Sequence, residues 1–397
     1  MPHLRYFTAG ESHGQGLVGI LEGLPANVAI SIEKINQQLA RRQQGYGRGG
    51  RMKIETDQVQ ILSGIRHDKS LGSPISFLIQ NRDWKNWDKI MAVSGTNPQK
   101  KIVEVPRPGH ADLSGAIKYD QSDMRNILER ASARETATRV ALGAIARQFL
   151  DALGIGIASH VIQIAEVKSE KTLIDFGSVD FNFDLKNLNE IADASPVRCV
   201  DKTTAEKMME TIDSAKSNRD TCGGIFEVVA FNLPVGLGSH VHWDRRLDSQ
   251  IAAAMMGIQA MKGVEIGDGF GGACRFGSQV HDEIYYDRSE NKFYRKQNNA
   301  GGLEGGMTNG MPVVVRVAMK PIATLMQPLD SIELESKKSV TAHVERSDVT
   351  AVPAAAVIGE AMLALTIAGS VLDKFGGDSF GEVKKRYDGW LEYTSNR

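Results

Sequence analysis

The residue types most able to do chemistry begin at a short turn in the first third of the chain. The run Arg107-Pro108-Gly109-His110-Ala111-Asp112 places a titratable histidine between an arginine and an aspartate. Proline fixes the backbone of such a turn, and glycine lets it adopt conformations closed to other residues. Because imidazole gains and loses a proton near neutral pH, His110 is a candidate acid–base group.

A pair of arginines follows this turn, and its spacing has two interpretations. Arg130 and Arg134 stand at positions i and i+4 with small residues between them, just before a long apolar-periodic segment, 137–150. On a helix this spacing puts both guanidinium groups on one face. Like charges side by side are unfavourable unless an anion such as phosphate or carboxylate lies between them. The pair therefore suggests a bound anion, but for an isolated pair we favour the alternative, a solvated helix face on which Glu129 and Glu135 partner the two arginines.

A second group of arginines surrounds a glycine-rich loop, residues 43–51. Arg41 and Arg42 end a predicted helix just before the loop, and Arg48 and Arg51 lie within it. We favour a site for a small anion, because the loop is short and is enclosed between a helix and a strand. A plain solvated loop is one alternative. The other is a segment that binds nucleic acid, although such arginine–glycine tracts usually repeat and lie in tails.

Other motifs are less specific. The glycines between 298 and 310 would let the backbone approach a ligand closely or form hairpin turns. No dinucleotide-binding Gly-x-Gly-x-x-Gly and no phosphate-binding Walker loop occurs. His240 and His242 alternate on a predicted strand as metal ligands can, but no third ligand is near them, so we predict no metal site. Arg346-Ser347-Asp348 precedes an apolar helix and by itself is typical of a cap or ion pair.

The composition of the whole chain narrows the class of protein. A formal net charge of −1 argues against binding to nucleic acid or acidic membranes through the net field of the protein. Three distant cysteines without a Cys-x-x-Cys pair favour a reducing compartment. The N-terminus has no apolar signal region, and Pro353 and Glu360 interrupt the most apolar stretch, 351–372. We therefore expect a cytoplasmic protein without a membrane span.

Periodicity and capping residues predict alternating helices and strands that must position these groups. Ser31 is predicted to cap a helix that ends at Arg42, and Gly154 to stop the helix over 137–150. Residues 168–200 are polar and weakly patterned, which indicates a surface excursion. Further helices are predicted over 204–217, 247–262 and 354–375, and strands over 59–62, 75–79, 155–165, 225–232 and 311–319.

Five separated signatures carry a resemblance to a known family. They are Gly10-Glu11-Ser12-His13-Gly14, Arg107-Pro108-Gly109-His110-Ala111-Asp112, Arg130-Ala131-Ser132-Ala133-Arg134-Glu135-Thr136, Lys262-Gly263-Val264-Glu265-Ile266-Gly267 and Arg346-Ser347-Asp348. Together, and in this order along nearly the whole chain, they resemble the chorismate synthase family. The departures are small: Ala131 stands where serine is commoner, and Gln43-Gln44-Gly45 replaces a more usual Arg/Gln-Pro-Gly.

The resemblance implies a reaction and a cofactor. Members of the family convert 5-enolpyruvylshikimate 3-phosphate into chorismate by an anti-1,4-elimination of phosphate, the last common step toward the aromatic amino acids. This reaction has no net redox change but needs reduced FMN, which lends an electron and receives it back. NADPH is a source of reducing equivalents for the flavin, either through the enzyme itself or through an external flavin reductase.

The resemblance also assigns roles to residues. His13 would give a proton to the departing phosphate, His110 would stabilise the reduced flavin at N1, and Asp348 would act with Ser12 and flavin N5 in removing the substrate proton. Arg42 and Arg48 match positions assigned to NADPH and also suit substrate. Arg51, Arg107 and Arg134 would complete a set of guanidinium groups for a phosphate and two carboxylates. FMN contacts map to Arg130, Ala131, Ser132, Gln259, Ala260, Gly305, Lys320, Pro321, Ile322, Ala323, Thr324 and Arg346.

The fold implied by the resemblance is a single α+β domain over residues 1–397, a β–α–β sandwich with a central helical layer between two antiparallel sheets. The active form in the family is typically a homotetramer. Two rival functions remain at this point. A flavin reductase would oxidise NADPH without the phosphorylated substrate. An RNA-binding module would use the arginine-rich loop and would lose affinity steeply with salt.

Overall fold

The computed structural model describes residues 4–49, 56–96, 98, 100–173, 184–289, 291–345 and 347–397. Its α-helices are α1 (Ile32–Gln43), α2 (Asp112–Tyr119), α3 (Arg125–Ala131), α4 (Thr136–Asp151), α5 (Leu188–Asp193), α6 (Lys202–Ser217), α7 (Leu247–Met256), α8 (Gly269–Ala273), α9 (Gly277–Val280), α10 (Val352–Phe375) and α11 (Phe380–Ser395). Short 3-10 helices cover η2 (Arg82–Asn86), η3 (Ala133–Glu135) and η4 (Trp243–Arg245).

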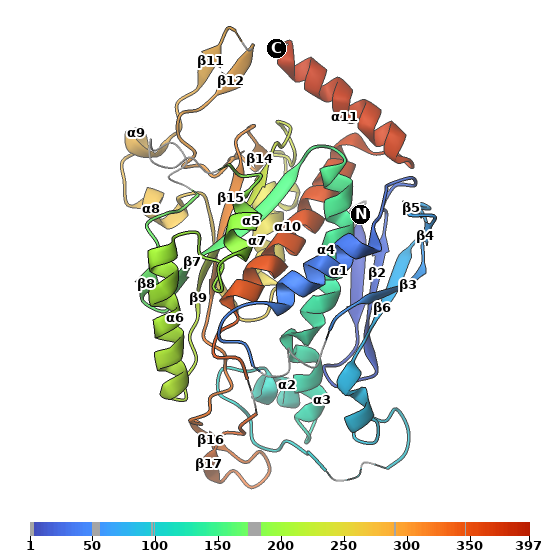
Figure 1. The fold of residues 1–397 in the computed structure, drawn as a ribbon, viewed down its shortest axis with the longest axis vertical. Coiled ribbons are helices and arrows are strands. Elements are labelled where there is room, and N and C mark those ends of the chain that lie inside the picture. The colour runs from blue at the N-terminus through green and yellow to red at the C-terminus, as the bar shows by residue number, and fades with distance from the viewer. Residues whose placement is uncertain are drawn as a thin grey trace.

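Two antiparallel sheets account for most of the strands (Figure 1). The first has the order β1-β2-β6-β3, formed by Arg5–Ala9, Gly16–Glu22, Ile75–Gln80 and Val59–Ser63. The second has the order β10-β15-β9-β7-β8, formed by Met261–Ile266, Val313–Met319, Gly224–Phe231, Gly156–Ile164 and Val167–Lys168. Among the described residues the other strands form four two-stranded ribbons: β4 (Ile65–Arg66) with β5 (Lys69–Ser70), β11 (Tyr285–Asp287) with β12 (Lys292–Tyr294), β13 (Leu303–Glu304) with β14 (Met307–Thr308), and β16 (Asp330–Ile332) with β17 (Ser339–Thr341).

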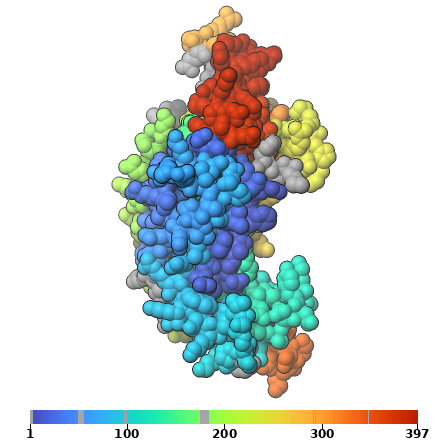
Figure 2. Space-filling view, turned by 90° about the vertical axis from the view of Figure 1, so that its right-hand side faces the viewer, coloured from blue at the N-terminus to red at the C-terminus, as the bar shows by residue number. Residues whose placement is uncertain are grey.

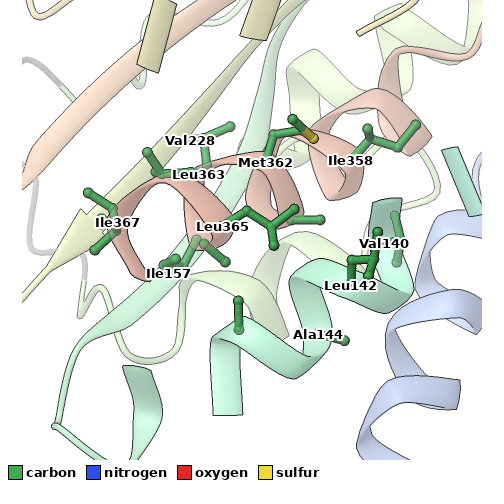
Figure 3. Close-up of a cluster of buried hydrophobic side chains, with 14 of the residues drawn as sticks. Val140, Leu142, Ala144, Ile157, Val228, Ile358, Met362, Leu363, Leu365 and Ile367 are labelled. Carbon is green, nitrogen blue, oxygen red and sulfur yellow. The ribbon is translucent and has the colours of Figure 1, made fainter. Parts of the chain in front are cut away.

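The apolar helices α4 and α10 pack against each other and against the sheets. Helix α4 contacts β2 of the first sheet and β7 of the second, and α10 contacts β7 and β9. Figure 3 shows Leu363 and Leu365 of α10 beside Val228 of β9 and Ile157 of β7, with α4 packed below α10. Both helices are buried on almost every face, as expected for helices with so few polar residues. The protein is therefore a mixed α+β structure whose core is helical at its centre.

The crossing of α4 and α10 depends on a glycine. A Cβ atom added at Gly143 would lie 2.4 Å from the Cβ of Ala361 and 2.5 Å from its Cα. Because the blocking atoms belong to a helix backbone and its first side-chain carbon, the helices themselves would have to separate. We expect Gly143→Ala to destabilise the protein by about 1–3 kcal/mol, the usual cost of overpacking.

The measurement is the denaturant midpoint of unfolding, compared with that of Gly381→Ala. Gly381 lies in α11 with no atom within 4 Å of an added Cβ. That control removes the difference in helix propensity between glycine and alanine. Equal midpoints for the two variants would show that α4 and α10 can separate without cost.

Most of the predicted elements are confirmed, and their ends move by a few residues. Ser31 caps α1, accepting a hydrogen bond from the backbone N–H of Lys34 at 3.3 Å. The prediction of a helix over 247–262 is wrong in its second half. Helix α7 ends at Met256, and residues 261–266 form a strand that pairs with β15. Cross-strand hydrogen bonding outweighs helical periodicity there.

Two further predictions about elements are wrong. His240 and His242 do not lie on a strand: His240 lies in a bend, and His242 precedes the short helix η4. The described part of the 168–200 excursion is partly core, since Leu173 and Leu188 are buried with Val229 of the second sheet.

Among the described residues one helix, α10, is long and apolar enough to cross a membrane, and 89% of its most apolar window is buried inside the protein.

Candidate functional site

A cavity of about 1230 Å³ lies where both sheets and the central helices end. Its walls come from the β1–β2 turn, the loop after α1, the turn before α2, the α3–α4 junction, the turn between α7 and β10, the segment after β15, and residues 343–358. The outline of the molecule is indented between the residues coloured teal, which include α2 and α3, and those coloured yellow (Figure 2). Ser12, His13, His110 and Asp348 all line the cavity, although they are distant in the sequence.

His13 is held on two sides by buried or half-buried neighbours. Its Nδ1 lies 2.9 Å from Oε1 of Glu129, and its backbone N–H donates to Oε2 of the same carboxylate at 2.8 Å. Its ring stacks on that of Trp87, with the centroids 3.8 Å apart and the planes 23° from parallel. Arg125 completes the pairing by donating to Glu129 at 2.9 Å. The imidazole is thus fixed in orientation with one nitrogen already engaged.

The carboxylate behind His13 is ionised. Burial by itself would raise the pKa of Glu129, but the hydrogen bonds and charges of His13 and Arg125 outweigh burial and lower that pKa. Lys101 and Arg125 also lie over the Trp87 ring, with the Lys101 ammonium 3.4 Å and the Arg125 guanidinium carbon 5.1 Å from its centroid. This wall of the cavity is therefore positively charged.

His110 has a similar arrangement on the opposite turn. Its Nδ1 contacts Oδ1 of Asp112 at 2.5 Å and lies 3.1 Å from Nη2 of Arg107. Asp112 is fully buried and also accepts from Nε of Arg107 at 2.8 Å. Burial alone would raise the pKa of Asp112, but the hydrogen bonds and charges of His110 and Arg107 hold it well below its ordinary range. The predicted rigid turn exists, with Gly109 at φ +76°.

The prediction that Arg130 and Arg134 share one helix face is wrong. Helix α3 ends at Ala131, and Ser132 adopts an extended backbone and caps the short helix η3 before α4 begins. Arg130 is turned outward and donates to the carbonyl oxygens of Thr8 and Gly10. Arg134 is buried and points into the protein. A serine that can cap a new turn interrupts the run, because its side chain satisfies the backbone N–H of Arg134.

The alternative interpretation, a solvated face, is also wrong. Glu129 and Glu135 are 2% and 3% exposed, so neither is a surface partner. Glu135 binds Arg139 at 2.6 Å and accepts a hydrogen bond from the Gln259 amide, also at 2.6 Å. Both carboxylates instead hold groups at the edge of the cavity in place.

A buried aspartate organises two of the predicted substrate arginines. Asp57 contacts Nη1 of Arg134 at 2.7 Å and Nη1 of Arg42 at 3.6 Å. Arg42 also donates to Thr136 Oγ1 at 2.9 Å, so its guanidinium is fixed against the first turn of α4. Burial and the nearby arginines lower the pKa of Arg42 to about 10 although Asp57 opposes this shift, and Arg42 stays charged at neutral pH.

The arginine-rich loop is packed against the protein and holds Asp348. Tyr46 hydrogen-bonds Asp213, and the carbonyl of Gly47 accepts from the backbone of Val349. Asp348 accepts the backbone N–H of Gly49 at 2.6 Å and lies 3.3 Å from Nη1 of Arg48. Of the four arginines around this loop, Arg41 points away into a buried ion network, and Arg51 lies outside the described residues.

The segment after β15 joins the two halves of the cavity wall. Residues 319–324 all line it, and Lys320 donates to the carbonyl of Gly109. Thr324 accepts from Arg107 at 3.1 Å, while its carbonyl accepts from the Ser347 hydroxyl at 2.8 Å. The segment therefore fixes the His110 turn relative to the segment that carries Asp348.

The cavity brings together most of the predicted site residues. It is lined by Ser12, His13, Arg42, Arg48, Arg107, His110, Ala131, Ser132, Arg134, Gln259, Ala260, Lys320, Pro321, Ile322, Ala323, Thr324 and Asp348. Two predicted FMN contacts lie elsewhere in this chain: Arg130 faces the β1–β2 turn, and Gly305 forms the turn of the β13–β14 hairpin. Arg346, like Arg51, lies outside the described residues.

Several residues of the site were missed by sequence reasoning. Asp57, Lys101 and Arg125 have no neighbouring motif, and Trp87 is one of two tryptophans in a loop without periodicity. Glu345 bridges Arg107 at 3.6 Å and Arg125 at 3.5 Å. Only the position of Glu345 beside the Arg346-Ser347-Asp348 signature could have drawn attention to it.

The charges of the lining suit anionic ligands. Arginines and lysines number seven there (Arg42, Arg48, Lys101, Arg107, Arg125, Arg134, Lys320), against three acidic residues (Asp83, Glu345, Asp348). Although the net charge of the chain is −1, the lining of this cavity carries an excess of positive charge. The volume also exceeds the roughly 300–1,000 Å³ usual for a single small ligand, so there is room for two.

Comparison with known proteins decides the family. The family model for chorismate synthase matches residues 4–372. The chain belongs to the chorismate synthase family. It is 54% identical to the chorismate synthase of Symbiobacterium thermophilum, covering 99% of this chain and 100% of that one, and 54% identical to that of Aquifex aeolicus, covering 99% of both. A crystal structure of chorismate synthase matches with a TM-score of 0.79 at 46% identity, covering 99% of each chain.

Family membership makes this protein an enzyme, a carbon–oxygen lyase acting on phosphates. It places the protein in the shikimate pathway of aromatic amino acid biosynthesis and implies a small-molecule substrate. The positively charged cavity described above is the candidate active site of the enzyme.

Proposed function

We propose that this enzyme converts 5-enolpyruvylshikimate 3-phosphate into chorismate and phosphate by an anti-1,4-elimination that requires reduced FMN. One observation supports this most. Two histidines, each bound at Nδ1 to a buried carboxylate, line the same positively charged cavity as Asp348. A substrate with a phosphate and two carboxylates needs guanidinium donors, and a phosphate that leaves needs a proton donor.

The residues present fit a reduced flavin. Gln259 lines the cavity, and its Oε1 is buried without a hydrogen-bond partner among the described residues, so a donor on a bound ligand would satisfy it. Apolar lining from Ile258, Ile322 and Ala355 offers contact for a flat ring. We propose that Ala131, Ser132, Gln259, Ala260, residues 320–324 and Arg346 hold FMN. Arg130 and Gly305 act only if a second copy or a rearranged loop brings them to the cavity.

Each residue then has a defined task. The chemistry that reduced FMN would supply when bound is a transient electron for breaking the allylic carbon–oxygen bond. His13 donates a proton from its free ring nitrogen to the departing phosphate. His110, held at Nδ1 by Asp112, turns its other nitrogen to the cavity and balances negative charge on the cofactor. Asp348, with Ser12, assists removal of the substrate proton.

The arginines orient the substrate in this proposal. Its phosphate and carboxylates are bound by Arg42, Arg48, Arg107 and Arg134, and by Arg51 of the arginine-rich loop. Arg42 and Arg134 are already fixed by Asp57, and Arg107 by Asp112. Guanidinium groups that are fixed before the ligand binds lose little side-chain entropy on binding. Arg42 and Arg48 also serve NADPH if the enzyme reduces its own flavin.

The decisive experiment is an anaerobic assay with reduced FMN and 5-enolpyruvylshikimate 3-phosphate, following phosphate and chorismate together. We expect equal amounts of both products, no product with oxidised FMN, and no net consumption of reduced flavin. Oxidation of NADPH without any need for the phosphorylated substrate would instead identify a flavin reductase. Salt-sensitive RNA binding that Arg48→Ala abolishes would support an RNA-binding module.

Arg48→Ala should weaken the substrate more than the flavin. Arg48 lines the cavity and contacts Asp348, so its loss removes one cation from the anion site. We expect KM for the substrate to rise about tenfold or more, since a charged hydrogen bond contributes roughly 1.5–3 kcal/mol, with little change in FMN affinity. Arg5→Ala is the control, because Arg5 is exposed and pairs with Glu22 on the first sheet. An unchanged KM would exclude Arg48 from the anion site.

We also propose that the chain is one domain with the β–α–β sandwich arrangement. One buried apolar cluster runs from Leu4 to Tyr387 and includes residues of both large sheets. Helix α4 contacts β2 of one sheet and β7 of the other, which is the arrangement that a central helical layer requires. Figure 1 shows α1, α4 and α10 between the strands of the two sheets.

A further inference from the structure

The carboxylate of Glu129 does not line the cavity, yet it contacts the β1–β2 turn at several points. It accepts the backbone N–H of His13 at 2.8 Å and faces the Nδ1 of the same residue at 2.9 Å. The backbone carbonyl of Glu129 accepts the N–H of Ser12 at 3.0 Å. Glu129 therefore fixes two neighbouring residues that both line the cavity.

The other side of the carboxylate is equally constrained. Arg125 donates to Oε1 of Glu129 at 2.9 Å, from one helical turn earlier on α3. Glu129 is 2% exposed, so water offers no substitute for these contacts. Trp87 covers one face of the His13 ring, and Asp83 fixes the indole by accepting from its Nε1 at 3.0 Å.

We propose that Glu129 is a positioning residue for His13, which it holds in the Nδ1–H form so that Nε2 faces the cavity as the proton-transferring atom. This inference rests on the proposed function of His13. The hydrogen bond made by one ring nitrogen sets which nitrogen carries the proton in neutral imidazole. Among the described residues Nε2 of His13 has no hydrogen-bond partner, and the ring lines the cavity. The proton donor is the imidazolium, which carries a proton on each nitrogen. When it gives up the Nε2 proton, the neutral Nδ1–H form that remains keeps its hydrogen bond to Glu129.

The test is Glu129→Gln, which keeps the shape of the side chain but replaces one acceptor oxygen with a donor. No orientation of the amide can accept from both the His13 backbone and its Nδ1–H while also accepting from Arg125. We expect kcat to fall about 10²-fold, as for a misplaced catalytic group, with KM for substrate and FMN affinity nearly unchanged. In the His13→Ala background the same change should alter kcat by less than about twofold, because the two residues act as a unit.

A second measurement does not depend on activity. The ¹⁵N signals of the His13 ring, recorded without substrate or flavin at a pH where the ring is neutral, should show the Nδ1–H form in the wild type and a shift toward the Nε2–H form in Glu129→Gln. The control is Glu227→Gln, which breaks another buried histidine–glutamate pair, with His160, away from the cavity. It should leave both the His13 signals and kcat as in the wild type.

The outcomes separate this inference from the proposed function. Unchanged His13 signals in Glu129→Gln would overturn the inference, as would an equal loss of kcat in the His13→Ala background. Failure of the wild type to form chorismate in the anaerobic assay would overturn the proposed function, while a shifted His13 signal would still establish the positioning by Glu129. A variant that does not fold would be replaced by Glu129→Asp, which keeps the charge and shortens the reach; full kcat there with wild-type ring signals would support the inference.

Discussion

Replacing His13 with alanine is expected to lower kcat by about 10²–10⁴-fold while the protein still binds FMN. The imidazole lines the cavity with Nδ1 engaged by Glu129, so Nε2 is the group free to give a proton. Departure of phosphate without a proton donor leaves more negative charge on the leaving group, and this raises the barrier. The fall should appear in single-turnover formation of chorismate, measured anaerobically with saturating flavin.

The control for this prediction is His242→Ala. His242 is exposed, lies outside the cavity, and pairs with Asp244 on the surface. Loss of the His242 ring should leave kcat unchanged. This control shows that a fall in kcat after His13→Ala is specific to His13. Flavin titration of the His13→Ala protein should give near-wild-type affinity. If that variant turned over at close to the wild-type rate, the role of His13 as proton donor would be refuted.

Glu360→Gln is expected to destabilise the protein by about 3–5 kcal/mol, because it leaves one buried and two half-buried arginines without their shared counter-charge. Glu360 lies in the middle of α10 and is 2% exposed. Arg41 and Arg147 contact it at 2.8 and 2.7 Å, and Arg198 contacts it at 3.2 Å. These arginines come from α1, α4 and the segment before α6, so one carboxylate joins elements far apart in the sequence.

The stability loss should depend on pH in a definite direction. Burial alone would raise the pKa of Glu360, but the charges of Arg41 and Arg147, with hydrogen bonds, lower it far below its ordinary value. A carboxylate with a lowered folded-state pKa contributes stability above its unfolded pKa, about 4.3, and that stability disappears as pH falls toward the folded value. The difference in free energy of unfolding between wild type and Glu360→Gln should therefore be full at pH 7 and shrink progressively below about pH 4.

Denaturant unfolding at several pH values measures this difference. Glu392→Gln is the control, since Glu392 lies on an exposed face of α11, and it should shift stability by no more than about 0.5 kcal/mol. A Glu360→Gln protein as stable as the wild type at pH 7 would show that the arginines find other partners. Asp193, which already binds Arg41 at 2.6 Å, is the nearest alternative.

Local patterns were enough to predict most elements and the identity of the family. Ser31 caps α1 as expected, and the apolar periodicity over 137–150 and 354–375 corresponds to α4 and α10. These features depend on residues within a few positions of each other, so a sequence displays them directly. The signatures that carry the family resemblance are equally local, and their order along the chain makes chance agreement negligible.

The end of α7 shows where local patterns fail. Residues 257–262 continue an apolar run, but Gly257 ends the helix and Met261 begins pairing with Met319 of β15. A short apolar run is compatible with either a helix or a strand. Pairing with β15, more than fifty residues later, selects the strand over the helix. The residues near 261 carry no pattern that indicates this pairing.

The chemical groups of this site, and the order in which the chain carries them, were determined by the sequence alone. The tertiary structure decided which charge meets which: Asp57 joins Arg134, Arg48 meets Asp348, and Glu129 turns from an expected surface residue into the buried partner of His13. The physical reason is that a buried charge needs a counter-charge within hydrogen-bonding distance. Folding brings those partners together from segments that share no sequence pattern.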